Sequence, residues 1–376
     1  MSWSIRLFKV KGIDVQVHLT FLLILVWAAF RWSGTTGAGW TGALFGVVAT
    51  LLLFASVTLH EIGHSLLALK FNVPVKDITL LPVGGLARIE KMPEKPSEEF
   101  RIAIAGPLVN FAIALSLIGL GVVLDLRAVI SISDLYQAMG QVSWSGMLAY
   151  LTMANVALGI FNLIPAYPMD GGRVLRALLA SLLGYVNATR IAVRIGQALA
   201  FAVGLWGFMS GSYSLILIAI FVWIGAGQEG RQVEAKEVLD DMTVRQVMTL
   251  SPHTLRPQDR LSNAVELILS TMQSDFPVVD QDGLRVLGML TEEDLLKGLK
   301  SYGASSLVSD SMRNVYSSAG PDEPLFGVQE QMGAKRVKSF PILDGEDQLL
   351  GLLTSQDINE AYKLFSTFPK LAHAIS

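Results

Sequence analysis

The sequence has no cysteine and few charged residues. Without cysteine, disulfide bonds and thiolate metal ligands are excluded from the 376 residues, so any metal must be held by nitrogen and oxygen. The formal net charge of -3 excludes the extended basic surface that binding to nucleic acid requires. Charged residues make up 16% and hydrophobic residues 52%, and the mean hydropathy is +0.49. This composition is typical of a membrane protein.

Long apolar runs fill about the first 230 residues, and ordinary mixed sequence follows them. A run of roughly 20 apolar residues is long enough to cross a bilayer. Candidate runs lie near residues 17–32, 40–69, 102–124, 144–183, 191–209 and 213–226. We therefore expect a multi-span α-helical protein of the cell membrane, with six transmembrane helices in the lipid bilayer.

Basic residues around these runs predict the orientation of the chain. Arg6, Lys9 and Lys11 precede the first run, which lacks a small-residue cleavage site, so we expect a retained anchor and a cytoplasmic amino terminus. The loops then placed inside carry further basic residues, namely Lys76, Arg88, Lys91, Lys95, Arg101, Arg173, Arg176 and Arg190. An even number of spans returns the carboxyl terminus to the cytoplasm as well.

The polar tail contains an internal repeat. "FPVVD" at 276–280 is followed by "GMLTEEDLL" at 288–296, and the pattern returns as "FPILD" at 340–344 and "GLLTSQDIN" at 351–359. Each copy predicts a helix, two strands joined by a turn, and a second helix. The tail resembles a tandem pair of cystathionine-β-synthase (CBS) domains, which implies a cytoplasmic α/β module.

The CBS resemblance implies a nucleotide site and a division of the chain. Residues matching the family segment that contacts ATP or another adenosine nucleotide are Thr291, Asp294, Thr354 and Asp357. The alternative is that these residues only cap the helices that follow them. CBS pairs commonly associate, so a homodimer is expected. The expected parts are a membrane domain (1–227), a linker (228–239), two CBS domains (240–300 and 301–365) and a tail (366–376).

A second motif, "HEIGH" at 60–64, lies inside an apolar run. His60 and His64 are four residues apart, so on a helix both imidazoles project from one face and can share a metal ion. Glu61 can then reach a metal-bound water without being a ligand. The alternative is a pair of polar residues satisfied at a helix interface. Ionisable groups are costly inside a membrane, which favours the metal site.

A catalytic zinc site normally has three protein ligands, so a third residue is needed. Pro165 and Pro168 interrupt the fourth run, and Asp170 follows this break. Asp170 could be only a turn residue, but beside the histidine motif we interpret it as a ligand. The other candidates are the remaining histidines, His18 at the start of the first span and His253 and His373 in the tail.

Together, the HExxH motif and N-x-x-P-x-x-x-x-D-G at 162–171 resemble the site-2 protease family of intramembrane zinc metalloproteases. The resemblance implies that His60, His64 and Asp170 bind one zinc ion per chain and that Glu61 is the general base. Asn162 matches a family asparagine that contacts substrate, although it could equally hydrogen-bond within the helix break. The expected substrate is a transmembrane or membrane-associated protein.

Two further segments surround these motifs. Residues 80–90, "LLPVGGLARIE", are apolar and rich in glycine but too short to span. We expect a re-entrant β-hairpin whose open edge, at Gly84, Gly85 and Leu86, pairs with extended substrate. The alternative is an interfacial loop. The segment "GPLVN" at 106–110 predicts close helix packing, and a role in substrate gating stays open.

The sequence therefore predicts a zinc-dependent intramembrane protease that a CBS pair regulates. One alternative is a CBS-regulated membrane transporter, since transporters also bind ions at broken helices. A transport site does not require Glu61 beside two histidines. The other alternative is a catalytically silent membrane scaffold, which does not require His60, Glu61, His64 and Asp170 together.

Overall fold

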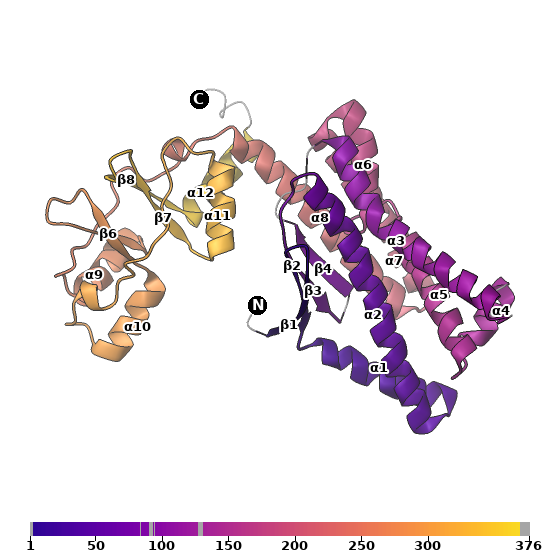
Figure 1. The fold of residues 1–376 in the computed structure, drawn as a ribbon. Coiled ribbons are helices and arrows are strands. Elements are labelled where there is room, and N and C mark those ends of the chain that lie inside the picture. Colours follow the sequence, from indigo (N-terminus) through magenta and orange to yellow (C-terminus); the bar gives the residue numbers. More distant parts are fainter. Residues whose placement is uncertain (1–2, 83, 90–92, 94, 127–130, 369–376) are drawn as a thin grey trace. The chain divides into compact units, whose positions relative to one another are not determined.

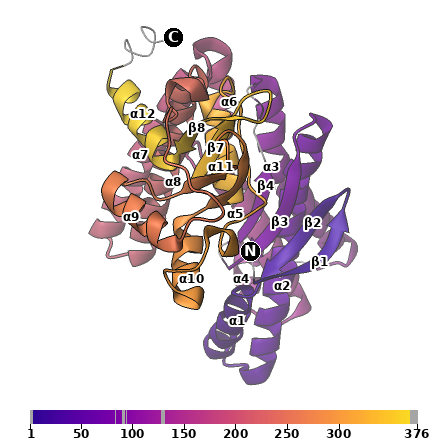
Figure 2. The same cartoon turned by 90° about the vertical axis from the view of Figure 1, so that its left-hand side faces the viewer.

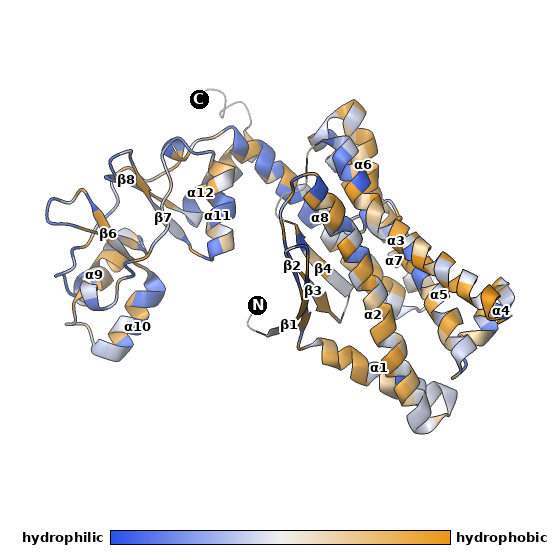
Figure 3. Ribbon diagram, in the orientation of Figure 1, coloured by the Kyte–Doolittle hydropathy of each residue, from blue (hydrophilic) through white to orange (hydrophobic). Residues whose placement is uncertain are grey.

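The computed structural model describes residues 3–82, 84–89, 93, 95–126 and 131–368. The chain divides into two compact units, Met1–Arg231 and Gln232–Ser376. Apolar residues cover the helices of the first unit, whereas polar and apolar residues alternate in the second (Figure 3). Large apolar side chains such as Trp27, Phe30 and Trp206 are exposed on helices of the first unit, which is typical of a protein in lipid.

The first unit combines a bundle of helices with one small sheet (Figure 1). In chain order its elements are β1 (Ser4–Val10), β2 (Ile13–His18), α1 (Phe21–Thr36), α2 (Gly39–Lys70), β3 (Val75–Leu81), β4 (Gly84–Ile89), α3 (Pro96–Val123), α4 (Ile132–Ala138), α5 (Trp144–Asn162), α6 (Asp170–Leu183), α7 (Tyr185–Met209) and α8 (Tyr213–Asp240). Helix α8 continues past the boundary between the two units.

Five helices within the described residues are long and apolar enough to cross a membrane, namely α2, α3, α5, α7 and α8. The remaining expected span corresponds to α1. Its 16 residues extend about 24 Å at 1.5 Å per residue, less than the ~30 Å of a hydrocarbon core. The helix is short because β2 takes up the chain as far as His18, where the sequence predicted the start of the span.

The apolar run at 144–183 forms two helices. α5 ends at Asn162 and α6 begins at Asp170, and an irregular segment with Pro165 and Pro168 lies between them. A proline cannot donate the backbone hydrogen bond that a continuing helix needs. The helix break expected from the two prolines is therefore present, and α5 alone provides the membrane-length part of this run.

The sheet has the strand order β1-β2-β3-β4 and lies beside α2 (Figure 2). Strands β1 and β2 form an antiparallel hairpin that the sequence analysis did not anticipate. β2 runs parallel to β3, because the α1–α2 hairpin between them returns the chain to the end of the sheet at which β2 begins. β3 and β4 pair antiparallel, with Leu81 opposite Gly84. Ile13, Val15 and Ile78 pack this sheet against Ala68 of α2 and Ile102 of α3.

Small residues let α1 and α2 approach closely. A Cβ atom added to Gly46 would lie 2.6 Å from the carbonyl oxygen of Ala28 and 2.7 Å from Cδ1 of Trp32. The Trp32 ring then rests on Phe45, with ring centroids 4.7 Å apart. Contacts between small residues and neighbouring backbone are a main source of helix association in lipid, where apolar side chains gain little from leaving the solvent.

The second unit contains two similar halves. Its elements are α9 (Leu261–Thr271), β5 (Phe276–Val279), β6 (Val286–Leu290), α10 (Glu292–Tyr302), α11 (Leu325–Lys335), β7 (Ser339–Leu343), β8 (Leu349–Thr354) and α12 (Ser355–Thr367), with short 3-10 turns at Val244–Gln246 and Val308–Asp310. Each half has the helix, strand, strand, helix order that the repeat predicted. The segment that precedes each half pairs with the other half. Thr249, before the first half, pairs with Leu352 of β8, and Arg313, before the second half, pairs with Met289 of β6. The halves therefore form one module.

We expect Gly46→Leu to lower the apparent melting temperature of the detergent-purified protein, because the new side chain must separate α1 from α2. Overpacking of this kind typically costs about 1–3 kcal/mol. Gly119→Ala on α3 is a suitable control, since its added Cβ would meet nothing within 4 Å. Equal melting temperatures for Gly46→Leu and the control would show that this contact does not hold α1 in place.

Candidate metal centre

The two histidines of the HExxH motif lie on one buried face of α2. His60 and His64 are each 6% exposed, and their ring centroids are 4.7 Å apart. Their Nε2 atoms are 3.1 Å from each other. The spacing of four residues thus brings both imidazoles to one point inside the bundle, as the helical pattern predicted.

The Nδ1 atom of each histidine has a hydrogen-bond acceptor beside it. Nδ1 of His60 lies 2.5 Å from Oδ1 of Asn110, and Nδ1 of His64 lies 2.6 Å from the carbonyl oxygen of Ile102. Both Nδ1 atoms must therefore carry a proton and donate it. In a neutral imidazole the other nitrogen, Nε2, then holds a lone pair.

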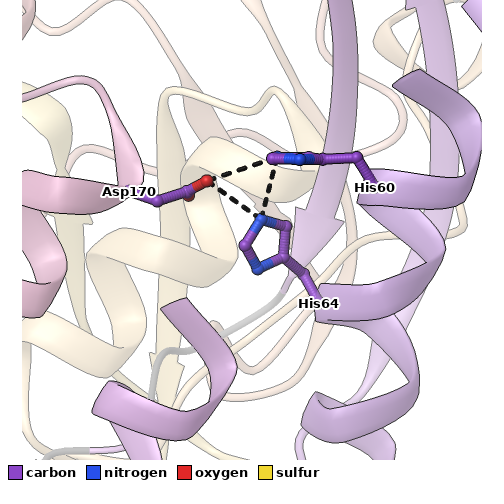
Figure 4. A group of neighbouring side chains, drawn as sticks. All are labelled: His60, His64 and Asp170. Carbon is purple, nitrogen blue, oxygen red and sulfur yellow. Dashed lines mark hydrogen bonds and ion pairs between the residues drawn. The ribbon is translucent and has the colours of Figure 1, made fainter. Parts of the chain in front are cut away.

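Asp170 adds a third ligand atom at the same point (Figure 4). It is the first residue of α6, directly after the helix break, and is 106 residues from His64. Its Oδ2 atom is 3.2 Å from Nε2 of His60 and 3.1 Å from Nε2 of His64. The break places Asp170 here because Gly171 and Gly172 lack side chains. A Cβ atom on Gly171 would lie 2.2 Å from the carbonyl oxygen of Ile164.

These three atoms suit a cation. In the tautomers selected by Asn110 and Ile102, two nitrogen lone pairs and one carboxylate oxygen face one another with no proton between them. Three converging acceptors in a buried place repel one another unless a positive charge lies among them. Two imidazoles and one carboxylate are also a known ligand set of catalytic zinc, with a fourth position left for water.

Glu61 lies beside this cluster but is not one of its members within the described residues. Strand β4 passes directly over it, since a Cβ atom on Gly85 would lie 2.7 Å from Cγ and 3.2 Å from Oε1 of Glu61. A side chain at position 85 would require the Glu61 side chain to move away from the strand. The carboxylate of Glu61 is thus held between α2 and the edge of the sheet.

The expected site residues of the membrane unit line one cavity of about 480 Å³. Its lining includes His60, Glu61, His64, Asp170, Asn162, Gly84, Gly85 and Leu86. The structure therefore brings every residue that the sequence analysis assigned to the membrane site onto one cavity. Phe161 and Leu158 of α5 supply apolar wall on the other side.

Two residues of the "GPLVN" segment take part in this site in a way that the sequence analysis missed. A Cβ atom on Gly106 would lie 2.2 Å from Nε2 of His64 and 2.6 Å from Nε2 of His60, so α3 can approach the imidazoles only at a glycine. Asn110, one turn further on, accepts the hydrogen bond of His60. A buried polar residue in an apolar helix was the available signal for Asn110.

The other histidines lie elsewhere. His18 ends β2, and its Nδ1 atom is 2.7 Å from Oγ1 of Thr20. His253 belongs to the second unit, where its backbone bonds to Gln273. His373 lies outside the described residues. Among the candidates for a third ligand, the structure places Asp170 beside the histidine pair.

In the second unit, Thr291 caps α10 and Thr354 caps α12, each through the backbone N–H of the aspartate three residues later. Asp294 also forms an ion pair with Arg313, with Nε 2.6 Å from Oδ2, and this hydrogen bond raises the pKa of the Arg313 guanidinium. Thr291 and Arg313 line a cavity of about 570 Å³. Its lining also includes Lys335, Arg336 and Lys338.

A buried cluster of two histidines and an aspartate with a glutamate beside it, set in apolar helices, is typical of a membrane metallopeptidase. The model of Peptidase family M50 matches residues 48–126 and 122–203, and the CBS domain model matches residues 244–301 and 308–364. The chain belongs to peptidase family M50, the site-2 protease family, and carries a tandem pair of CBS domains. Both resemblances seen in the sequence are confirmed.

Several relatives extend over most of the chain. Zinc metalloprotease MJ0392 of Methanocaldococcus jannaschii is 38% identical over 285 residues, covering 76% of this chain and 77% of the relative. The putative zinc metalloprotease sll0528 of Synechocystis is 30% identical over 378 residues, covering 95% of each chain. A solved structure of the site-2 protease of M. jannaschii is 42% identical, covers 61% of this chain and 96% of its own, and has a TM-score of 0.43.

We expect Gly106→Ala to abolish or strongly reduce metal binding, because the new methyl group occupies the space of both imidazoles. Metal per chain, measured by mass spectrometry on purified protein, checks this. Gly119→Ala on the same helix is the matched control, since its Cβ meets nothing within 4 Å. Full metal content in Gly106→Ala would contradict the close approach of α3 to the histidines.

Proposed function

We propose that this protein is a zinc-dependent intramembrane protease whose substrate is a transmembrane or membrane-associated protein, and that its CBS pair regulates it. The observation that carries the proposal is the convergence of three lone-pair ligand atoms, from His60, His64 and Asp170, in a buried cavity that Glu61 also lines. His60, His64 and Asp170 hold the metal, one ion per chain.

The chemistry follows from these positions. Bound to the three residues, zinc would lower the pKa of a water molecule toward about 7 and polarise a peptide carbonyl. Glu61 would take a proton from that water as the water oxygen bonds to the carbonyl carbon, and would give the proton to the nitrogen that leaves when the C–N bond breaks. The position of Glu61 between α2 and β4 supports this role, since the strand restricts where its carboxylate can lie.

The substrate has to be extended before it is cut, because a helix hides its carbonyl groups in its own hydrogen bonds. β4 is the last strand in the order β1-β2-β3-β4, so within the described part of the chain its outer edge is unpaired. We propose that β3 and β4 form a re-entrant hairpin and that substrate adds to the β4 edge at Gly84, Gly85 and Leu86. Asn162, at the end of α5, binds substrate backbone from the opposite wall.

The membrane topology proposed here counts α1 as a sixth span and places both termini in the cytoplasm. The antiparallel packing of α1 on the longer α2 supports this, since Gly42 and Gly46 meet residues of α1 in reverse order. The proposed membrane domain is 1–227, followed by a linker at 228–239, CBS domains at 240–300 and 301–365, and a tail at 366–376. The basic residues of the expected inner loops support the orientation.

Regulation has a physical route through α8, which leads into the second unit. A Cβ atom on Gly225 of α8 would lie 2.8 Å from Cδ of Pro168, two residues before Asp170. Four residues later, Glu229 is 2.7 Å from Nη1 of Arg176, a buried residue of α6. A shift of α8 would therefore move the segment that positions Asp170. We propose that the CBS pair acts on the metal centre by this route.

The ligand proposed for the CBS pair is ATP or another adenosine nucleotide. Arg313, Lys335, Arg336 and Lys338 line the 570 Å³ cavity together with Asp275, Glu292 and Glu293. The basic side chains support a phosphorylated ligand, and Thr291, which also lines the cavity, bonds to Asp294. Thr354 and Asp357 form the equivalent cap in the second half. Leu269 on α9, Met272 directly after it and Leu296 on α10 are exposed apolar residues, which supports the proposal of a homodimer formed through the CBS domains.

Glu61→Gln should keep zinc but lose cleavage of a single-span substrate, because the amide cannot accept the proton of the water. Asp170→Ala should lose both, since it removes a ligand. Co-expression with a substrate that carries a cytoplasmic tag measures cleavage, and zinc content is measured on the purified variants. Wild-type cleavage by either variant would contradict the residue roles, and zinc-loaded wild type that cuts none of a broad substrate panel would favour the scaffold.

We expect Gly225→Ala to reduce cleavage by up to about 100-fold, because the added methyl group pushes on Pro168 and displaces Asp170. Gly227→Ala is a matched control on the same helix, since its Cβ would meet its nearest atoms at 3.5 Å and 3.8 Å. Rates measured with purified enzyme and substrate in bilayers test this. Equal rates for the two variants would exclude the α8 route.

A further inference from the structure

Two asparagines are fully buried between α2, α3 and α5. Asn110 on α3 and Asn155 on α5 are each 0% exposed. Asn110 contacts the metal-ligand candidate His60, whereas Asn155 lies behind it and touches neither His60 nor the other ligands through any hydrogen bond given for the described residues. Buried amides are costly in an apolar bundle unless each polar atom is paired.

The hydrogen bonds of these residues run in a single direction. Nδ1–H of His60 donates to Oδ1 of Asn110. Nδ2 of Asn110 donates to Oδ1 of Asn155 at 2.9 Å. Nδ2 of Asn155 in turn donates to the carbonyl oxygen of Leu151 at 2.8 Å and to Oγ of Ser56 at 3.2 Å. Each Nδ2 atom donates to at least one acceptor and each Oδ1 atom accepts from one donor, so the orientation of one amide fixes that of the next.

We infer that Asn155 is a positioning residue that keeps His60 in the tautomer able to bind a metal, an inference that rests on the proposed zinc site. If the Asn110 amide turned over, its NH₂ group would face Nδ1 of His60. Nδ1 would then have to be the acceptor, and the proton would move to Nε2, which could no longer bind a metal. Asn155 prevents this reversal, because a reversed Asn110 would place its Oδ1 against Oδ1 of Asn155.

His64 does not need such a relay, since its Nδ1 donates to the backbone carbonyl of Ile102, which cannot turn over. His60 depends on a side-chain amide with two possible orientations. Residues that hydrogen-bond to a metal ligand without binding the metal themselves typically change metal affinity by about 10–100-fold when they are removed. A purely structural Asn155 would instead lower the stability of the helix bundle and leave the affinity of the folded protein unchanged.

The test compares zinc affinity and the visible spectrum of the cobalt-substituted protein in full-length variants. We expect Asn155→Leu to weaken zinc binding about 10–100-fold and to alter the cobalt spectrum. Asn155→Asp should restore both with the buried acid protonated, because its carbonyl oxygen accepts from Nδ2 of Asn110 and its O–H donates to the carbonyl oxygen of Leu151 in place of Nδ2. Thr152→Val is the control, since Thr152 is also buried on α5 and its hydroxyl, within the described part of the chain, donates to the carbonyl oxygen of Leu148 on its own helix. Its affinity and spectrum should equal those of the wild type.

A second comparison separates positioning from folding. In an Asn110→Leu background, Asn155→Leu should add no further loss of affinity, although both changes lower the melting temperature of the apoprotein. An additional loss there would show that Asn155 does not act through Asn110 and would overturn the inference, as would unchanged affinity and spectrum in Asn155→Leu. A wild type that binds neither zinc nor cobalt would overturn the proposed function together with this inference.

Discussion

The side chains of His60 and His64, which are buried, and of Asp170, which is partly buried, present three acceptor atoms to one another on one cavity. Such an arrangement is stable only if hydrogen bonds hold each group in its orientation and a cation offsets the repulsion among the three acceptor atoms. The carbonyl of Ile102 and the amide of Asn110, both on α3, fix the imidazoles. Helix α3 therefore supplies both groups that orient the imidazoles, besides its apolar contacts with α2.

Glycine makes this arrangement possible at three separate contacts. Gly106 lets α3 approach the imidazoles, Gly171 lets the broken helix fold back before α6, and Gly85 lets β4 cross Glu61. In each case a Cβ atom would lie within 2.7 Å of an atom of the site or its support. Gly106, Gly171 and Gly85 thus allow the close contacts around the cavity in which a substrate and a metal would meet.

Features encoded by local pattern could be predicted from the sequence. His60 and His64 share a face because of helical periodicity, and the break before Asp170 follows from two prolines. The two halves of the second unit are visible in the sequence as a repeated pattern of residues. The β1–β2 hairpin was missed because its residues were interpreted only as a charged lead to the first span. Its signal was the turn at Lys11 and Gly12, where both residues have positive φ.

The Asn110–Asn155 pairing could not be predicted, because it joins residues 45 apart in sequence and depends on how α3 and α5 pack. Its only sequence signal is that each asparagine lies in an apolar helix. Likewise, the meeting of Gly85 with Glu61 depends on where the sheet lies against α2. Local pattern selected His60, Glu61, His64 and Asp170 as candidate site residues, whereas the residues that hydrogen-bond to them or pack on them became visible only in three dimensions.

X-ray absorption at the zinc edge, measured on the purified full-length protein, would show whether the two histidines and Asp170 bind zinc. We expect one zinc per chain in a four-coordinate shell of nitrogen and oxygen at about 2.0–2.2 Å, with the scattering pattern of two imidazoles. Asp170→Ala should remove one light-atom ligand from that shell or the metal altogether. A wild type that retains no zinc, or a shell without imidazole scattering, would contradict the account.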